Sequence, residues 1–307
     1  MAGIGMMARL RCSARICACA AAAALCSLVP AMPSAAYWFV DADAAVFHDD
    51  NLTNAEEVFD IVGDWAFAVS ASAGYRFQFD GYSSLTLRTW MDGEKYLDVS
   101  GLDNLFLGIE AAYRRKLGLG YTAPWIGFSA STGHFSFDRD DRDGWRHRVA
   151  VSAGKRFGRR LDVWVELAYE RRTTDHVRPV FPGYSGAVFN LNDLRLGLNA
   201  AYSITDRVSL DMGYEYLRGD VVSTLLVFQP GKSIYVVTSA VAADPAFGPG
   251  AFSYRLMGTA HTVGARLSVA ITGRLGAALE YRRVMTLARG DNDYTKDIIR
   301  FGVSYGF

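Results

Sequence analysis

The 307-residue chain has no cysteine beyond position 26, no excess of charge and few histidines. Its four cysteines all lie near the start, and 32 basic residues face 32 acidic ones. This balance excludes the strongly basic surface that nucleic-acid binding needs, so we expect no nucleic-acid partner. Because the rest of the chain lacks cysteine, disulfide frameworks, thiol nucleophiles and cysteine-ligated metals are excluded there.

The first 36 residues have the pattern of a signal peptide. Three early arginines precede an apolar run over 16–29, and small residues end at Ala36. We therefore expect a signal peptide over 1–36 and one exported domain over 37–307. A lipid-modified Cys26 is the alternative.

Long apolar runs are also missing after position 36, which excludes a transmembrane helix in the exported part. Apolar residues instead alternate with polar or small ones at a period of two, which predicts strands with one apolar face and one polar or small face. The alternating segments are 38–47, 67–79, 82–91, 105–114, 123–132, 146–154, 161–170, 194–203, 208–216, 263–269, 275–282 and 299–307.

These segments approach the length of roughly 9–11 residues that a strand needs to cross a bilayer. A soluble β-sandwich also alternates, but its strands are usually nearer 5–6 residues. Short and long connections alternate along the chain, as in barrels with periplasmic turns and extracellular loops. The fold class we predict is all-β, a closed antiparallel transmembrane β-barrel of about 12 strands.

The connection over 218–254 is unusually long and has apolar residues on both parities. Such a pattern suits neither a strand between lipid and lumen nor a free loop. Three interpretations are open: an inward constriction, an extracellular hairpin, or an extra strand pair that would raise the count to about 14.

The last segment, 299–307, alternates to a terminal phenylalanine. With the signal peptide and the cysteine-free remainder, it resembles the bacterial outer-membrane β-barrel superfamily, which includes the porins. The resemblance implies residence in the bacterial outer membrane, contact with its lipid and lipopolysaccharide, and recognition by the barrel-assembly machinery. The residues it implies for the assembly signal are Phe301, Val303, Tyr305 and Phe307.

Charged side chains gather on the polar face of the predicted strands, where eleven arginines oppose nine carboxylates. This slight positive excess predicts a preference for anions. The candidate lumen-lining residues are Asp43, Arg76, Arg88, Glu110, Arg146, Arg148, Glu166, Glu170, Arg195, Glu215, Arg266, Glu280 and Arg300.

Two interpretations of this interior compete. The charges can line a water-filled path narrowed by Trp125 and Trp164, or they can pair and fill the barrel. Folding the hairpins predicts the pairs Arg148–Glu170, Arg195–Glu215 and Arg266–Glu280, and closure predicts Arg300 near Asp43. We expect a passive porin-like channel for small polar or anionic solutes. The alternative is a structural or adhesive barrel with a filled lumen and ligand-binding loops.

Catalytic chemistry has little support in the sequence. Of the five histidines, His147 and His261 fall on the apolar face, where an esterase acting on lipid could place its base, but neither has an obvious serine beside it on its own strand. The acidic loops at 48–51 and 138–143 lack a complete EF-hand pattern. We therefore expect no catalytic residues, no metal and no cofactor, with a lipid-modifying enzyme as the least favoured alternative.

Overall fold

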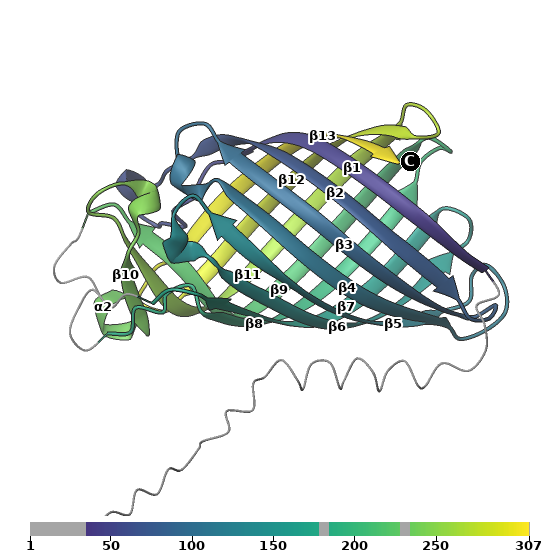
Figure 1. Ribbon diagram of the computed structural model, residues 1–307, viewed down its shortest axis with the longest axis horizontal. Helices are drawn as coiled ribbons and strands as arrows, with labels where there is room; N and C mark the ends of the chain where they lie inside the picture. The colour runs from purple at the N-terminus through teal and green to yellow at the C-terminus, as the bar shows by residue number, and fades with distance from the viewer. Residues whose placement is uncertain (1–34, 178–183, 228–233, 307) are drawn as a thin grey trace, which may run out of the picture.

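The protein is described by a computed structural model over residues 35–177, 184–227 and 234–306, and one antiparallel sheet contains most of them (Figure 1). Its strands are β1 (Ala35–Asp49), β2 (Asp64–Gln78), β3 (Ser83–Tyr96), β4 (Asn104–Lys116), β5 (Trp125–Phe137), β6 (Gly144–Phe157), β7 (Leu161–Thr174), β8 (Leu191–Ser203), β9 (Val208–Leu225), β10 (Ala240–Ala243), β11 (Phe252–Ala270), β12 (Leu275–Ala288) and β13 (Tyr294–Gly306). The short helical elements are η1 (Val58–Asp60), η2 (Ser100–Leu102), η3 (Asp140–Arg142), α2 (Ile234–Val237) and η4 (Pro245–Phe247). In these described ranges no helix has the length and apolar character needed to cross a membrane.

Twelve of the strands close the sheet into a barrel. Sequence neighbours pair from β1 to β9, β9 pairs with β11, and β13 pairs with both β12 and β1. The predicted twelve-stranded barrel is confirmed. The alternative of fourteen strands is wrong, because the described part of the segment between β9 and β11 adds only β10, which pairs with the first residues of β11.

Side chains alternate between an exposed apolar outer face and a more buried inner face. Leu107 and Ile109 of β4 are 53% and 60% exposed, whereas Phe106, at the opposite parity, is 2% exposed. In water an apolar band of this extent would be unfavourable, but in a bilayer it faces the acyl chains. The soluble β-sandwich is therefore excluded, and the strands span a membrane.

This assignment of faces can be tested at Leu167, which lies near the middle of β7 and is 49% exposed. We expect Leu167→Arg to lower the free energy of unfolding in lipid by about 2–4 kcal/mol, because a charge at the bilayer midplane loses its hydration. The matched change Asn199→Arg adds the same charge beside an inner cavity and should cost much less. Urea unfolding in lipid vesicles measures both, and equal losses would show that the faces are misassigned.

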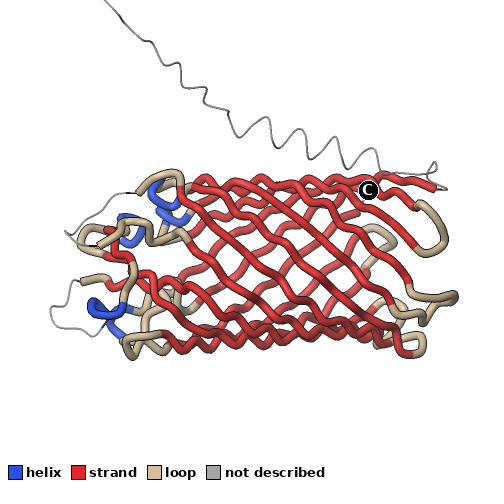
Figure 2. Tube along the Cα trace, turned by 90° about the horizontal axis from the view of Figure 1, so that it is seen from below, coloured by secondary structure: helices blue, strands red, loops and turns tan. Residues whose placement is uncertain are grey.

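The two ends of the barrel differ. Helical elements lie at one end only (Figure 2), with the long loops, while short turns and the ends of the described chain lie at the other. In the turn after β2, the Asp80 carboxylate accepts hydrogen bonds from the backbone N–H groups of Tyr82 and Ser83 at 2.7 and 2.5 Å. These bonds hold the pKa of Asp80 below its usual range. Short turns are periplasmic in outer-membrane barrels, so the helical end faces outward.

The hairpin of β9 and β11 continues beyond the other strands, with Leu225 paired to Phe252. An apolar cluster of Val221, Leu225, Val241, Tyr254 and Leu256 covers this extension, which explains why the sequence here is apolar on both parities. Of the residues predicted to carry targeting signals, positions 1–34 and Phe307 lie outside the described ranges.

Candidate functional site

The strand register places every predicted lumen residue on the inner parity, and one group of them forms a lattice of ion pairs across β6 to β9. Arg148 lies opposite Glu170 at 3.9 Å and contacts Glu166 at 2.5 Å. Arg195 contacts Glu170 and Glu215, both at 3.5 Å. The shared carboxylate of Glu170 links the two arginines, so this side of the wall is held by paired charges.

The remaining predicted residues are more loosely joined. Arg88 contacts Glu110 at 3.5 Å, and Asp43 accepts a hydrogen bond from Ser70 at 3.4 Å. Glu280 lies opposite both Arg266 and Arg300 in the register, but its carboxylate contacts Arg282 at 3.1 Å.

The predicted proximity of Arg300 to Asp43 is wrong. Arg300 lies opposite Phe47 of β1, with its guanidinium 5.9 Å from the ring, and Asp43 lies opposite Ser304. No turn connects β13 to β1, so nothing local in the sequence fixes the register at which the barrel closes.

Arginines and aromatic rings alternate on the inner wall of β4 to β7. The Arg146 guanidinium lies 4.4 Å from the Phe106 ring and 5.1 Å from the Phe135 ring. Arg172 lies 5.0 Å from Phe135 and 5.4 Å from Phe137. These stacked side chains occupy part of the lumen toward the outer end.

Three cavities follow one another along the interior. The first, of about 600 Å³, lies at the short-turn end and includes Trp125 and Trp164, which were predicted to face inward. The second, of about 540 Å³, shares Trp164 with the first, and the third, of about 670 Å³, shares Arg282 with the second. Gly154 lets the two tryptophans lie close to the wall, since a Cβ there would be 2.6 Å from the Trp125 ring.

The outer end of the third cavity is covered by a group of packed loops, here called the mouth cap. Its apolar residues come from the loops after β1, β3 and β9, and so from distant parts of the barrel rim: Leu52, Val62, Val99, Leu102, Ala246 and Phe247. A buried ion pair of Arg142 with Asp244, at 2.5 Å, joins the loop after β5 to the same cap. Of the interpretations of the 218–254 segment, the structure combines a hairpin with a loop that folds over the mouth.

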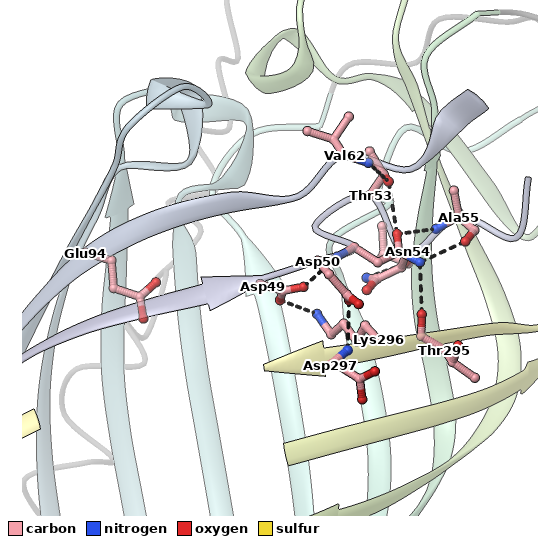
Figure 3. A network of polar contacts seen from close by, with 12 residues as sticks. Asp49, Asp50, Thr53, Asn54, Ala55, Val62, Glu94, Thr295, Lys296 and Asp297 are labelled. Carbon is pink, nitrogen blue, oxygen red and sulfur yellow. Dashed lines mark hydrogen bonds and ion pairs between the residues drawn. The ribbon is translucent and has the colours of Figure 1, made fainter. Parts of the chain in front are cut away.

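Hydrogen bonds fasten the loop after β1 to both sides of the mouth. Lys296 of β13 donates to Asp49 at 2.9 Å, and the backbone N–H of Asp297 donates to Asp50 at 2.8 Å (Figure 3). At the other side, the backbone N–H of Thr224 donates to the carbonyl of Thr53 at 2.8 Å. The acidic segment at 48–51 therefore anchors the cap through protein contacts.

Sequence reasoning missed several charged residues of the inner face because it ended the strands too early. Continuing the alternation to the observed strand ends would have found them. They are Asp49, Asp64, Asp92, Glu94, Lys116, Asp193 and Lys296. With these five carboxylates and two lysines included, the predicted positive excess of the whole lumen disappears, so charge has to be compared cavity by cavity.

The first and third cavities are basic, and the second is acidic. The first is lined by Arg76, Arg114, Lys116, Arg156 and Asp162. The charged residues of the second are Glu166, Asp211, Glu215, Glu280, Arg266 and Arg282. Those of the third are Arg142, Arg146, Arg282, Lys296, Arg300, Asp49, Asp92 and Glu94.

A polar group on the outer face, centred on His134, was not identified by the sequence analysis. His134 contacts Asp175 through Nε2 at 2.7 Å, and Ser136 lies 3.4 Å from its Nδ1. The alternation of β5 alone would have placed His134 and Ser136 on one face. His147 contacts the Thr132 hydroxyl at 2.9 Å, and His261 contacts the Tyr214 hydroxyl at 2.8 Å.

Comparison with known proteins agrees with this architecture. An outer membrane channel from Pseudomonas putida F1 superimposes with a TM-score of 0.52 and 11% identity, over 91% of this chain and 100% of that one. The NanC porin has a TM-score of 0.46 and 8% identity, over 86% of this chain and 98% of that one. The Pseudomonas putida channel is similar to this protein in fold.

Outer membrane protein P1 of Haemophilus influenzae is 27% identical over 127 residues, which is 41% of this chain and 26% of that protein. The match thus spans about a quarter of the relative's length. The sequence family described as outer membrane protein beta-barrel domain matches residues 105–307, more than half of the chain. With its closed barrel and exposed apolar band, the chain therefore belongs to this family of outer-membrane β-barrels.

Proposed function

We propose that the protein is a channel that lets small polar solutes, anions among them, cross the outer membrane. The observation that carries the proposal is the series of three cavities, which share Trp164 and Arg282 as common walls and run from the short-turn end to the mouth cap. Empty polar volume of this kind fills with water, and charged walls replace part of the hydration of a passing solute.

The order of charge along the path supports a preference for anions at both entrances. Basic side chains predominate in the first and third cavities, so an anion is attracted from either side, while the acidic second cavity prevents tight trapping. A channel needs sites weak enough to release what they bind. In this proposal the predicted lumen residues, Arg146, Glu215, Arg266 and Arg300 among them, line the path.

Liposome swelling tests the proposal. Gluconate, glucose and glucosamine are similar in size and differ in charge, so their relative rates report selectivity rather than pore width. We expect swelling with gluconate and glucose, with gluconate faster, and slower swelling with glucosamine. Absence of swelling with all three, from protein shown to be folded by heat-modifiable migration, would contradict the channel.

A structural or adhesive barrel is the second candidate, and the mouth cap favours it. A cap packed on apolar residues and held by a buried ion pair lies at the outer end of the third cavity, and its loops offer a surface for a partner. The two candidates differ in one measurable respect: loosening the cap opens a channel but leaves a filled barrel closed.

A lipid-modifying enzyme is supported only by the contacts of His134 with Asp175 and Ser136. Ser136 lies within β5 opposite Leu105, so its backbone is part of the sheet ladder, whereas an oxyanion site needs free N–H donors beside the nucleophile. We expect no phospholipid hydrolysis by the purified wild-type protein and no difference between it and Ser136→Ala. Hydrolysis that Ser136→Ala abolishes would instead establish an esterase.

A further inference from the structure

The first cavity, at the short-turn end, combines aromatic rings with cations that lack carboxylate partners. Among its charged residues, Arg156 and Asp162 neutralise each other through two side-chain hydrogen bonds. The other three, Arg76, Arg114 and Lys116, form no ion pair with any described carboxylate. The cavity therefore carries a net positive charge that the protein itself does not balance.

The contacts of the two arginines show that their charges are available. Arg76 donates only to neutral hydroxyls, those of Tyr37 at 3.3 Å and Ser84 at 3.2 Å, and its buried Nε has no hydrogen-bond partner. Arg114 lies over the Trp125 ring, with its guanidinium 4.0 Å from the ring centre. The guanidinium charges of Arg76 and Arg114 are therefore balanced by no described carboxylate, and a carboxylate that enters the cavity would pair with them.

Size and lining restrict the class of ligand. A volume of about 600 Å³ is in the range of sites for small organic molecules, and far exceeds what an inorganic ion needs. Arg114 covers a face of the Trp125 ring and Arg156 covers a face of the Tyr121 ring, while Trp164 adds a third ring to the lining. Guanidinium groups bind carboxylates through paired hydrogen bonds, while aromatic faces stack on flat or sugar rings.

We propose that this cavity is a binding site for small cyclic carboxylates, with Arg76 and Arg114 holding the carboxylate and Trp164 contacting the ring. The inference deepens the proposed function and rests on it for its biological meaning, because it names the solute class that the lumen would retain. Binding itself requires no passage through the mouth cap, so the two can be tested separately.

Isothermal titration calorimetry on the purified full-length barrel in detergent tests the site with four probes. Benzoate and glucuronate distinguish an aromatic from a sugar ring, and benzyl alcohol and glucose are their neutral counterparts. We expect at least one carboxylate to bind, with neutral counterparts about tenfold weaker or worse. Equal binding of a carboxylate and its neutral counterpart, or equal competition by chloride, would overturn the site.

Substitutions of the two arginines test whether the carboxylate binds in the first cavity. Arg76→Gln and Arg114→Gln should each weaken carboxylate binding about tenfold or more, and Arg114→Lys should restore part of it. Arg283→Gln removes the same charge from the outer face, where Arg283 pairs with Asp297 at 3.3 Å, and should leave binding unchanged. Unchanged affinity in both glutamine variants would overturn the assignment. If these variants fail to fold, the four wild-type titrations still decide it.

The results also separate this inference from the channel. Carboxylate binding without liposome swelling would uphold the site and contradict the channel. Swelling without carboxylate binding would uphold the channel and overturn the site.

Discussion

Truncation of the chain after Arg300 should abolish assembly of the barrel in the outer membrane. Residues 301–306 of β13 pair with β12 on one side and β1 on the other, and these pairs close the sheet. Without them both neighbouring strands keep unpaired N–H and carbonyl groups, which cost several kcal/mol each in lipid. We expect loss of nearly all folded protein, measured as the heat-modifiable band in outer-membrane fractions.

Two variants separate closure from recognition of the end of the chain. Ser304→Ala, on the inner parity, keeps the apolar face and should assemble normally. Phe301→Ala combined with Tyr305→Ala keeps the backbone pairs but weakens the predicted assembly signal, so it should delay or reduce assembly. Normal amounts of folded truncated protein would contradict the role of β13 in closing the barrel.

Loosening the mouth cap should open the channel. Gly101 lies against η4, where a Cβ would stand 2.5 Å from the Cα of Ala246 and 2.9 Å from its carbonyl oxygen. Gly101→Ala therefore forces the two loops apart, at a cost of about 1–3 kcal/mol. That corresponds to about a 5- to 150-fold increase in the population with a displaced cap. We expect faster liposome swelling and faster protease cleavage within residues 234–251.

The control is Gly118→Ala, in a short turn where the nearest atom to a new Cβ is 3.8 Å away. It should leave swelling and cleavage at wild-type rates. If Gly101→Ala increases cleavage but not swelling, the cap moves and the lumen beneath it is filled, which would favour the structural barrel.

Alternation made the barrel predictable from sequence. The face on which Leu107 or Glu110 lies can be predicted from its own strand alone, because each strand has lipid on one side and the lumen on the other. The pair Arg148–Glu170 could be predicted for the same reason, since a short turn fixes the register of the hairpin and places the two residues directly opposite each other. Arg195 and Glu215 also make the predicted contact, although Arg195 lies opposite Leu217 and Glu215 is its diagonal neighbour.

Features that depend on contacts between segments far apart in the chain could not be predicted from the sequence. The neighbour of Arg300 depends on how the barrel closes, and the cap depends on contacts such as Gly101 with Ala246, from loops far apart in sequence. Apolar residues on both parities showed that the 218–254 segment is not a free loop, but they did not decide among an inward constriction, an extracellular hairpin and an extra strand pair. The sequence analysis predicted strands that were too short, because strand pairing continues past the alternating segments. Asp92, Glu94 and Lys296 were therefore not predicted as residues of the inner face.

The most direct test of the account is single-channel recording of the purified wild-type protein and Gly101→Ala in planar bilayers under a salt gradient. The account predicts brief, uniform conductance steps for the wild-type protein, longer open times for Gly101→Ala, and a reversal potential that indicates anion preference in both. Absence of conductance in both folded proteins would contradict a solute path through the barrel.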